Sequence, residues 1–355
     1  MAAVIERNLF GLEIDPRCTQ IGAFNLALAA WRRVGHRPLP AMNLACSGLA
    51  PNSQKADWLE IAGNNEKLKN GMERLYRLFK DAPVLGSLIN PRTGEGDLLE
   101  AGFHELQPLL EKALAQESKD DAAHEIAVTA RGLAKAAEIL AGQFTLVATN
   151  VPYLGRSKQE ETLADYCKRF HPDAKSDLAT CFVERCLAFC VQGGSTALVT
   201  PQNWLFLGTY KKLRQTMLTS TMWNAVVRLG EGGFESSQAA GAFIALLMHT
   251  RSDTTNAHSF AALDASEPKT RESKSHAVMR NQFSIVRQKD QLANPDTRIT
   301  TEELRGGELL SKLADYGKGS TTGDRPRFLL MFWELPKLGG ENALWLDSPN
   351  TEALW

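Results

Sequence analysis

Hydrophobic positions near the N-terminus follow a strand pattern, then a helix pattern, then a strand pattern again. The apolar run Asn8–Ile14 ends at Asp15-Pro16 and predicts a short strand. From Thr19 to Val34 the apolar positions recur with helical spacing and predict a helix, which Gly35 would end. The run Ala41–Cys46 predicts a second strand. This order and spacing are typical of the βαβ unit of a parallel sheet.

A helix-rich stretch, 51–142, interrupts this alternation. It is rich in Lys, Glu, Ala and Leu and predicts helices near 57–80, 97–116 and 120–141. The alternation then returns, with strands at 144–148, 195–199, 223–229 and 241–248 and helices at 176–191 and 210–218. Residues 250–300 are polar, and we expect loops or an irregular sheet edge there. The pattern predicts an α/β fold with a helical insertion of about 90 residues.

Composition narrows the class of protein. The chain has 355 residues, of which 43% are hydrophobic, and a net charge of −1, values of an ordinary globular protein without a global signature of nucleic-acid binding. Its six cysteines form no CxxC pair and no zinc-ligand spacing, so we predict no metal site. No secretion signal and no apolar run of about 18 residues are present, so we expect a cytoplasmic protein without a membrane span.

The most informative motif is Asn150-Val151-Pro152-Tyr153, directly after the predicted strand FTLVA. In open α/β sheets, ligands bind at the carboxyl ends of the strands. The Asn150 side-chain oxygen and the backbone carbonyl of Val151 could accept hydrogen bonds from an exocyclic amino group, while the Tyr153 ring stacks on a flat base. Taken alone, the four residues are equally typical of a turn that begins at an asparagine.

An acid stands near the end of the first predicted strand. Glu13, in Gly11-Leu12-Glu13-Ile14-Asp15-Pro16, could accept both ribose hydroxyls of a nucleoside cofactor. An ordinary surface or capping acid would have the same sequence environment, so Glu13 alone does not identify a cofactor site.

The collinear order of these and three further motifs resembles the adenine-specific (N6) DNA methyltransferases of BREX phage-exclusion and type IIG restriction–modification systems. The resemblance covers 8–50 and 140–250, and 310–335 more loosely. The motifs that carry it are GLEIDP, TNVPYLG, HPDAKSDL, GGSTALVTPQNWLF and LGEGGFES. It implies a Rossmann-like sheet that binds S-adenosylmethionine, and double-stranded DNA as the substrate.

The resemblance also implies a role for individual residues. Asn150, Pro152 and Tyr153 match the amino-group motif, in which an extruded adenine donates its amino hydrogens while Tyr153 stacks on it. Phe234 matches a second aromatic against the base, and Glu13 matches the acid on the cofactor ribose. The segment YKKLR offers candidate phosphate contacts, namely Lys211, Lys212 and Arg214, although a solvated helix face would have the same sequence.

The sequence departs from the family pattern at three places. Val151 replaces a proline, a change that keeps the backbone carbonyl. After the second predicted strand the family has an acid for the cofactor adenine, where this chain has only Ser47 as a weak substitute. The Gly-rich cofactor loop and the strand before it would precede Asn8, and the seven residues there contain no glycine. The first strand of the sheet is therefore expected to be missing, which leaves an edge open to self-association.

These motifs divide the chain into four parts and leave three functions open. The parts are 8–50 and 143–250 of the methyltransferase domain, the insertion 51–142, and 251–355 with the start of a target-recognition segment. The first function is adenine methylation in phage defence or restriction–modification, by a chain truncated at both ends. The absence of the Gly-rich loop leaves open whether this chain is active alone. The others are methylation of a protein glutamine, and a non-catalytic subunit that assembles with other phage-defence subunits.

Overall fold

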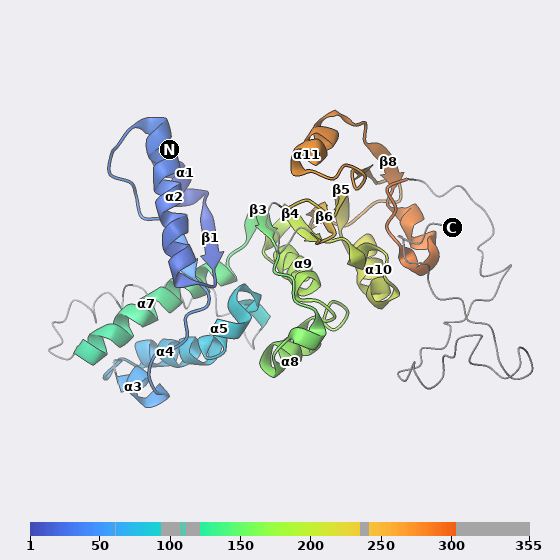
Figure 1. Ribbon diagram of the computed structural model, residues 1–355. Helices are drawn as coiled ribbons and strands as arrows, with labels where there is room; N and C mark the ends of the chain where they lie inside the picture. Colours follow the sequence, from blue (N-terminus) through green and yellow to red (C-terminus); the bar gives the residue numbers. More distant parts are fainter. Residues whose placement is uncertain (61, 94–107, 109, 111–120, 235–240, 303–355) are drawn as a thin grey trace, which may run out of the picture. The chain divides into compact units, whose positions relative to one another are not determined.

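The computed structural model describes residues 1–355 except 61, 94–107, 109, 111–120, 235–240 and 303–355 (Figure 1). The described residues belong to one compact unit, Met1–Leu304. The predicted helix 97–116 and the predicted start of a target-recognition segment lie outside the described residues.

The N-terminal elements form a βαβ unit, as the sequence predicts. They are α1 (Ala2–Arg7), β1 (Phe10–Glu13), α2 (Pro16–Val34) and β2 (Asn43–Cys46), and β1 pairs in parallel with β2. The Asp15 carboxylate caps α2 by accepting the Arg17 amide at 2.8 Å, and Pro16 occupies the first helical position. Gly35 follows the helix with a φ of 75°, which glycine adopts without steric cost.

Helical elements connect this unit to the main sheet. The predicted helix 57–80 is two helices in the structure, separated around Gly63, whose φ is 49°. The Asn65 side chain caps the second of them by accepting the Leu68 amide. The elements of this stretch are α3 (Lys55–Glu60), α4 (Glu66–Phe79), α5 (Ala82–Leu85), two 3₁₀ turns (Gly86–Leu88 and Pro91–Thr93) and α7 (Asp121–Ala141).

The main sheet has six strands in the order β3-β4-β6-β5-β7-β8. The β3–β4 and β5–β7 pairs are parallel, whereas β6 is antiparallel to both of its neighbours. The strands are β3 (Phe144–Asn150), β4 (Cys190–Pro201), β5 (Met222–Gly230), β6 (Ile244–Thr250), β7 (Ser259–Asp264) and β8 (Ser284–Arg287), and the helices α8 (Glu161–Phe170), α9 (Leu178–Ala188) and α10 (Lys211–Ser220) precede β4 and β5. The predicted α/β class is confirmed.

The expectation of loops or an irregular edge in 250–300 was wrong in part, because regular strands form the edge of the sheet there. Residues in this range form β7, α11 (Arg271–Arg280) and β8, and the two strands extend the main sheet. The helix begins with a capping box in which Thr270 and Ser273 bond each other's backbone amides. The helix was not predicted because its capping box has a serine in place of the usual Glu or Gln. The strands were not predicted because they are short and polar residues surround them.

A buried arginine joins α9 to the helical elements. Arg185 is only 1% exposed, and its guanidinium donates to the carbonyls of Ser87, Ile89 and Leu140 at 2.8–3.1 Å. It also lies 3.7 Å from the centre of the Phe189 ring. Burial lowers the pKa of Arg185 to about 10. This one side chain satisfies carbonyls from segments about 50 and 100 residues away and so fixes the helices against the sheet.

A buried lysine joins α11 to the ends of β5 and β7. The ammonium of Lys274 donates to the carbonyls of Leu229, Ala265 and Ser266, and the residue is 2% exposed. Desolvation lowers its pKa. The carbonyls lie where the chain leaves the carboxyl ends of β5 and β7, so Lys274 fixes that edge of the sheet.

Replacing Lys274 by Met should lower the free energy of unfolding by about 2–4 kcal/mol, because buried carbonyls lose their donor. The matched change Lys269→Met, at an exposed lysine, should cost no more than about 0.5 kcal/mol. Urea unfolding of both variants measures the difference. Equal stability of the two variants would show that the Lys274 contacts contribute nothing.

A histidine in β6 is buried without polar partners. His249 is 0% exposed, and neither ring nitrogen has a hydrogen-bond partner among the described residues. The Trp223 ring lies edge-on at 4.5 Å between centroids. Burial lowers the pKa of His249 from 6.5 to about 3, because charge is costly in this apolar environment.

This histidine predicts a loss of stability in mild acid. The unfolded imidazole takes up a proton below pH 6.5 and the folded one only near pH 3, so its contribution is present above pH 6.5 and is lost as the pH falls. At pH 5 the loss should be about 2 kcal/mol relative to pH 7. In His249→Leu the decline between pH 7 and pH 5 should be smaller by that amount. Parallel declines of both proteins in urea unfolding would contradict this assignment.

Candidate functional site

The motif Asn150-Val151-Pro152-Tyr153 stands at the carboxyl end of β3, the place that the sequence predicts. Asn150 is the last residue of the strand, and the Val151 amide donates to the Val199 carbonyl of β4 at 3.2 Å. The Tyr153 hydroxyl donates to Asn150 Oδ1 at 3.1 Å. Asn150 and Pro152 are exposed, whereas Val151 is buried. Since an amide oxygen has two lone pairs, Asn150 Oδ1 can accept a second hydrogen bond from a ligand.

One carboxylate fixes the chain that follows the motif. Asp177 Oδ1 caps α9 by accepting the Ala179 amide at 2.9 Å, and it also accepts the Leu154 amide at 3.4 Å. The Leu178 amide returns a hydrogen bond to the Leu154 carbonyl at 3.0 Å. The start of α9 and the end of the motif are therefore held together, which limits where Tyr153 can lie.

Two aromatic rings meet next to the exposed amide. Tyr153 and Phe234 have ring centroids 6.5 Å apart at an interplanar angle of 53°. Phe234 follows the carboxyl end of β5, and both rings are half-buried. Burial, with a smaller contribution from Asp177, raises the pKa of Tyr153 to about 12, so its hydroxyl is protonated at neutral pH and acts as a donor. The structure thus brings Asn150, Tyr153 and Phe234 together.

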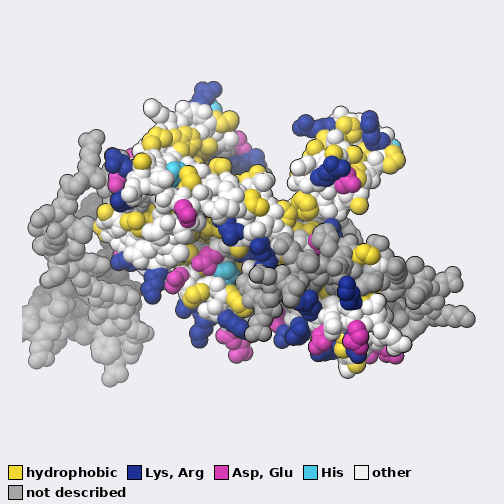
Figure 2. All heavy atoms as spheres, turned by 180° about the vertical axis from the view of Figure 1, so that it is seen from behind, with side chains coloured by type: hydrophobic (Ala, Val, Ile, Leu, Met, Phe, Trp, Pro, Cys, Tyr) yellow, Lys and Arg dark blue, Asp and Glu magenta, His cyan; other side chains and the backbone are white. Residues whose placement is uncertain are grey.

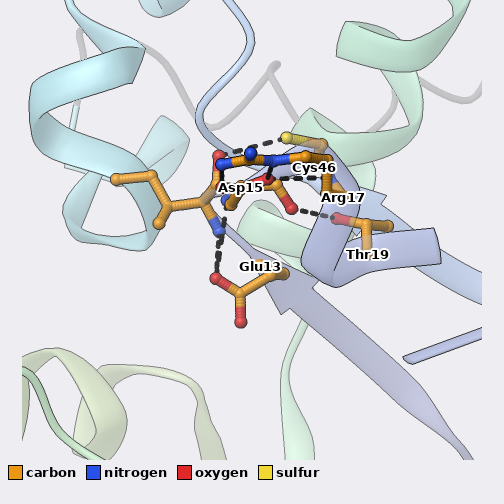
Figure 3. Close-up of polar contacts among 6 residues, drawn as sticks. Glu13, Asp15, Arg17, Thr19 and Cys46 are labelled. Atoms are coloured by element: carbon orange, nitrogen blue, oxygen red, sulfur yellow. Dashed lines mark hydrogen bonds and ion pairs between the residues drawn. The ribbon is translucent and has the colours of Figure 1, made fainter. Parts of the chain in front are cut away.

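Glu13 is the last residue of β1 and lies next to the turn that leads into α2 (Figure 3). Its Oε1 accepts the Ile14 amide at 2.8 Å, while its other oxygen points away from the turn in Figure 3. The neighbouring Asp15 forms an ion pair with Arg17 at 2.7 Å, and the hydrogen bond from Arg17 lowers the pKa of Asp15 to about 2. Asp15 and Arg17 therefore neutralise each other, and Glu13 is left as the carboxylate that can accept from a ligand.

Ser47 joins the ends of β1 and β2. Its amide donates to the Glu13 carbonyl at 2.7 Å, and its hydroxyl lies 3.3 Å from that carbonyl and 3.0 Å from Ser87 Oγ. Ser47 is 0% exposed. The next residue must be small, since a Cβ on Gly48 would lie 2.2 Å from the Ile14 carbonyl oxygen. In this arrangement Ser47 holds the Glu13 backbone, and its hydroxyl is engaged with Ser87.

The three candidate phosphate contacts of the YKKLR segment differ in exposure. Lys211 and Lys212 are exposed on α10, and Lys211 pairs with Asp296 at 3.5 Å. Arg214 is 0% exposed and donates to the carbonyls of four residues, Trp204, Leu207, Asp296 and Thr297. The prediction that Arg214 contacts phosphate was wrong for this conformation, because its donors face the interior of the protein.

Two groups of predicted site residues thus form, at two places. Among the described residues, no hydrogen bond or ring contact joins Glu13 and Ser47 to Asn150, Tyr153 and Phe234. The described part of the chain also contains no cluster of three or more His, Cys, Asp or Glu side chains that could hold a metal ion. Within the same residues, no helix is long and apolar enough to span a membrane.

The sequence interpretation did not name two residues that shape the site. Asp177 was part of a quoted motif but had no role, although an Asp directly before the apolar run LATCF is a helix-start signal. Lys274 gave no signal, because a lysine in the polar segment RESKSH reads as a surface residue.

Comparisons with known proteins place the motifs in a family. The model of the Eco57I restriction-modification methylase family matches residues 7–234. The adenine-specific methyltransferase PglX of Lacticaseibacillus casei (strain Zhang) is 28% identical over 243 residues, which are 65% of this chain and 19% of PglX. The adenine-specific methyltransferase BrxX of Escherichia coli O9:H4 (strain HS) is 26% identical over 256 residues, 65% of this chain and 21% of BrxX.

The chain spans about a fifth of the length of these curated relatives. Among solved structures, a nuclease-deletion mutant of the type ISP restriction-modification enzyme LlaGI, in complex with a DNA substrate mimic, is similar with a TM-score of 0.46 and 10% identity over 79% of this chain and 20% of LlaGI. The family model covers well over half of the chain, including both groups of site residues. The chain therefore belongs to the Eco57I restriction-modification methylase family.

Proposed function

We propose that this chain is the methyltransferase core of an adenine-specific DNA methyltransferase, which methylates adenine N6 in DNA in a restriction-modification or BREX-like phage-defence setting. The observation that supports this most is the group Asn150, Tyr153 and Phe234 at the carboxyl ends of β3 and β5. An amide acceptor beside two aromatic rings fits a flat base that carries an exocyclic amino group.

In this proposal, Asn150 Oδ1 and the Val151 carbonyl accept the two amino hydrogens of an adenine that has left the base stack. The amino lone pair is then directed toward the methyl donor, and Tyr153 and Phe234 cover the faces of the ring. No general base has to remove a proton from the adenine amine before methyl transfer, because the methylated amine can lose its proton afterwards. The Tyr153 hydroxyl, protonated at neutral pH, donates to Asn150 and fixes the orientation of the amide.

S-adenosylmethionine is the proposed cofactor and would supply the methyl group. Glu13 fits its ribose, since one carboxylate oxygen bonds the local backbone and the other points away from the turn. Ser47 acts in this proposal through the Glu13 backbone that it holds. The described residues offer no Gly-rich loop beside Glu13 for the methionine end.

DNA contacts are proposed for Lys211 and Lys212, and no longer for Arg214. The Lys211–Asp296 pair is exposed, and such pairs contribute at most about 1 kcal/mol, so Lys211 can exchange Asp296 for a phosphate. Other phage-defence subunits remain proposed partners, and the cytoplasm, where DNA is methylated, remains the proposed location.

Asn150→Ala should reduce methyl transfer to DNA by roughly 10²–10³-fold, because a positioned acceptor for the reacting amine is lost. Asn150 is exposed, so the thermal midpoint should not change. The measurement is tritium transfer from labelled S-adenosylmethionine to double-stranded DNA, with the whole polypeptide that carries this chain. Tyr153→Phe keeps the ring and loses only the hydroxyl, and it should have a much smaller effect than Tyr153→Ala.

The matched control is Asn281→Ala, an exposed asparagine beyond α11, which should keep full transfer. A parallel reaction with glutamine-containing peptides separates the two possible substrates. Full DNA methylation by the Asn150→Ala protein, or transfer to peptide in place of DNA, would overturn the proposal.

A further inference from the structure

The segment that contains α2 and β2 carries cations and no acid. Residues 16–56 include five Lys or Arg side chains and no Asp or Glu, although the net charge of the whole chain is −1. Three of the five, Arg32, Arg33 and Arg37, lie at the end of α2 or just after it, and His36 stands among them. All four side chains are exposed. These four residues form the basic end of α2.

Other side chains do not neutralise the basic end of α2. Neither Arg32 nor Arg33 has an ion pair or a side-chain hydrogen bond among the described residues. Within the same residues, the Arg37 guanidinium donates only to a backbone carbonyl, that of Val34. The helix dipole favours cations in the last turn of α2, but His36 and Arg37 lie beyond that turn. The basic end therefore presents positive charge to a ligand, and the dipole alone does not account for it.

Local contacts hold the basic end of α2 in a defined arrangement. The Trp31 indole N–H donates to the Arg37 carbonyl at 2.8 Å, and the Gly35 amide donates to the Trp31 carbonyl at 2.9 Å. The rings of Trp31 and His36 have centroids 5.0 Å apart. Pro38 follows and restricts the backbone. The chain after α2 thus folds back onto the last turn of the helix, so Arg37 and His36 stay close to Arg32 and Arg33.

The basic end of α2 lies at the edge of the two-stranded sheet that is opposite Glu13. α2 begins just after the carboxyl end of β1 and returns the chain to the amino end of β2. Its 19 residues extend about 28 Å, whereas the four residues of β1 extend about 13 Å, so the end of α2 projects beyond the strands (Figure 1). Figure 2 shows Lys and Arg side chains at the surface of the lobe that α1 and α2 form, at the upper right. The basic end is thus remote from the turn beside Glu13.

We propose that the basic end of α2 binds the phosphate backbone of double-stranded DNA outside the target site. A guanidinium plane can donate two parallel hydrogen bonds to one phosphate, and the three cations beside His36 are all arginines. A duplex carries one negative charge per roughly 1.7 Å of its axis, so a short stretch of backbone can meet several of these side chains. Phosphate contacts of this kind do not depend on the base sequence.

The choice of DNA rests on the proposed function, which gives this protein a duplex as its substrate. The phosphate-binding surface itself rests only on the charge and geometry of the basic end of α2. Because this surface lies at the edge opposite Glu13, the DNA bound there is not the stretch that presents the adenine. It adds affinity that is independent of sequence and keeps the protein on DNA between target sites.

The salt dependence of DNA binding tests this surface without reference to methyl transfer. Fluorescence anisotropy measures the affinity of the 355-residue chain for a labelled duplex of about 30 base pairs, or three helical turns. Arg32→Gln/Arg33→Gln/Arg37→Gln should lower the affinity at least about 10-fold at roughly 0.1 M salt. The slope of log K against log salt should become less negative by about 2–3, because fewer counterions are released.

Two further variants separate local contacts from other effects. Lys69→Gln/Arg77→Gln/Lys80→Gln, at exposed cations on α4 and at its end, removes the same charge and should leave the slope unchanged. Arg32→Gln/Arg33→Gln removes side chains without hydrogen bonds in the described structure, so it should keep the thermal midpoint and still change the slope by about 2.

Three results would overturn the proposal. The first is an unchanged slope in the variants of the basic end of α2. The second is an equal change in the α4 variant, which would indicate an effect of net charge alone. The third is loss of binding to polyglutamate with full binding to DNA, which would assign the surface to an acidic protein. Failure of methyl transfer would count against the proposed function and would leave this binding result intact.

Discussion

The Asp177 carboxylate holds the loop that follows the Asn150–Tyr153 motif in place. It accepts the Leu154 amide just beyond the Asn150–Tyr153 motif and caps α9 through the Ala179 amide. α9 in turn carries Arg185, whose guanidinium is buried against carbonyls of the 3₁₀ turn 86–88, Ile89 and the last turn of α7. The position of an exposed amide at the end of β3 therefore depends on contacts that extend into the helical insertion. A capping hydrogen bond contributes only about 1 kcal/mol, but here the same carboxylate also fixes the backbone just beyond Tyr153.

The two groups of candidate site residues differ in how they are connected to the main sheet. Asn150, Tyr153 and Phe234 lie at the ends of strands that pair within the main sheet, and they contact one another. Glu13 lies at the end of a two-stranded sheet that has no backbone pairing to β3 among the described residues. Its turn is nevertheless well defined, because Asp15, Arg17, Ser47 and Cys46 fix the local backbone (Figure 3).

Sequence patterns predicted the elements that have strong local signals. The βαβ unit 8–46 was predicted because helical periodicity and a Gly mark the helix between its strands. The helix begins three residues before the predicted start, because Asp15 and Pro16 form its N-terminus. The motif at Asn150 was located because an apolar strand precedes it. Long-range partners were not predictable in this way. Arg214 looked like a surface residue beside two lysines, although it shares a helix face with the buried Met217 and Leu218. Lys274 is buried because α11 packs against the ends of β5 and β7, which are distant in sequence from one another. A local sequence pattern does not predict such a contact.

The central claim is that this chain presents adenine N6 to a methyl donor. Nucleoside mass spectrometry tests it most directly, on genomic DNA from cells that carry the complete gene and from otherwise identical cells that carry the Asn150→Ala allele. The account predicts N6-methyldeoxyadenosine in the first DNA and its loss in the second. Methylation of cytosine alone, or equal N6-methyldeoxyadenosine in both, would contradict it.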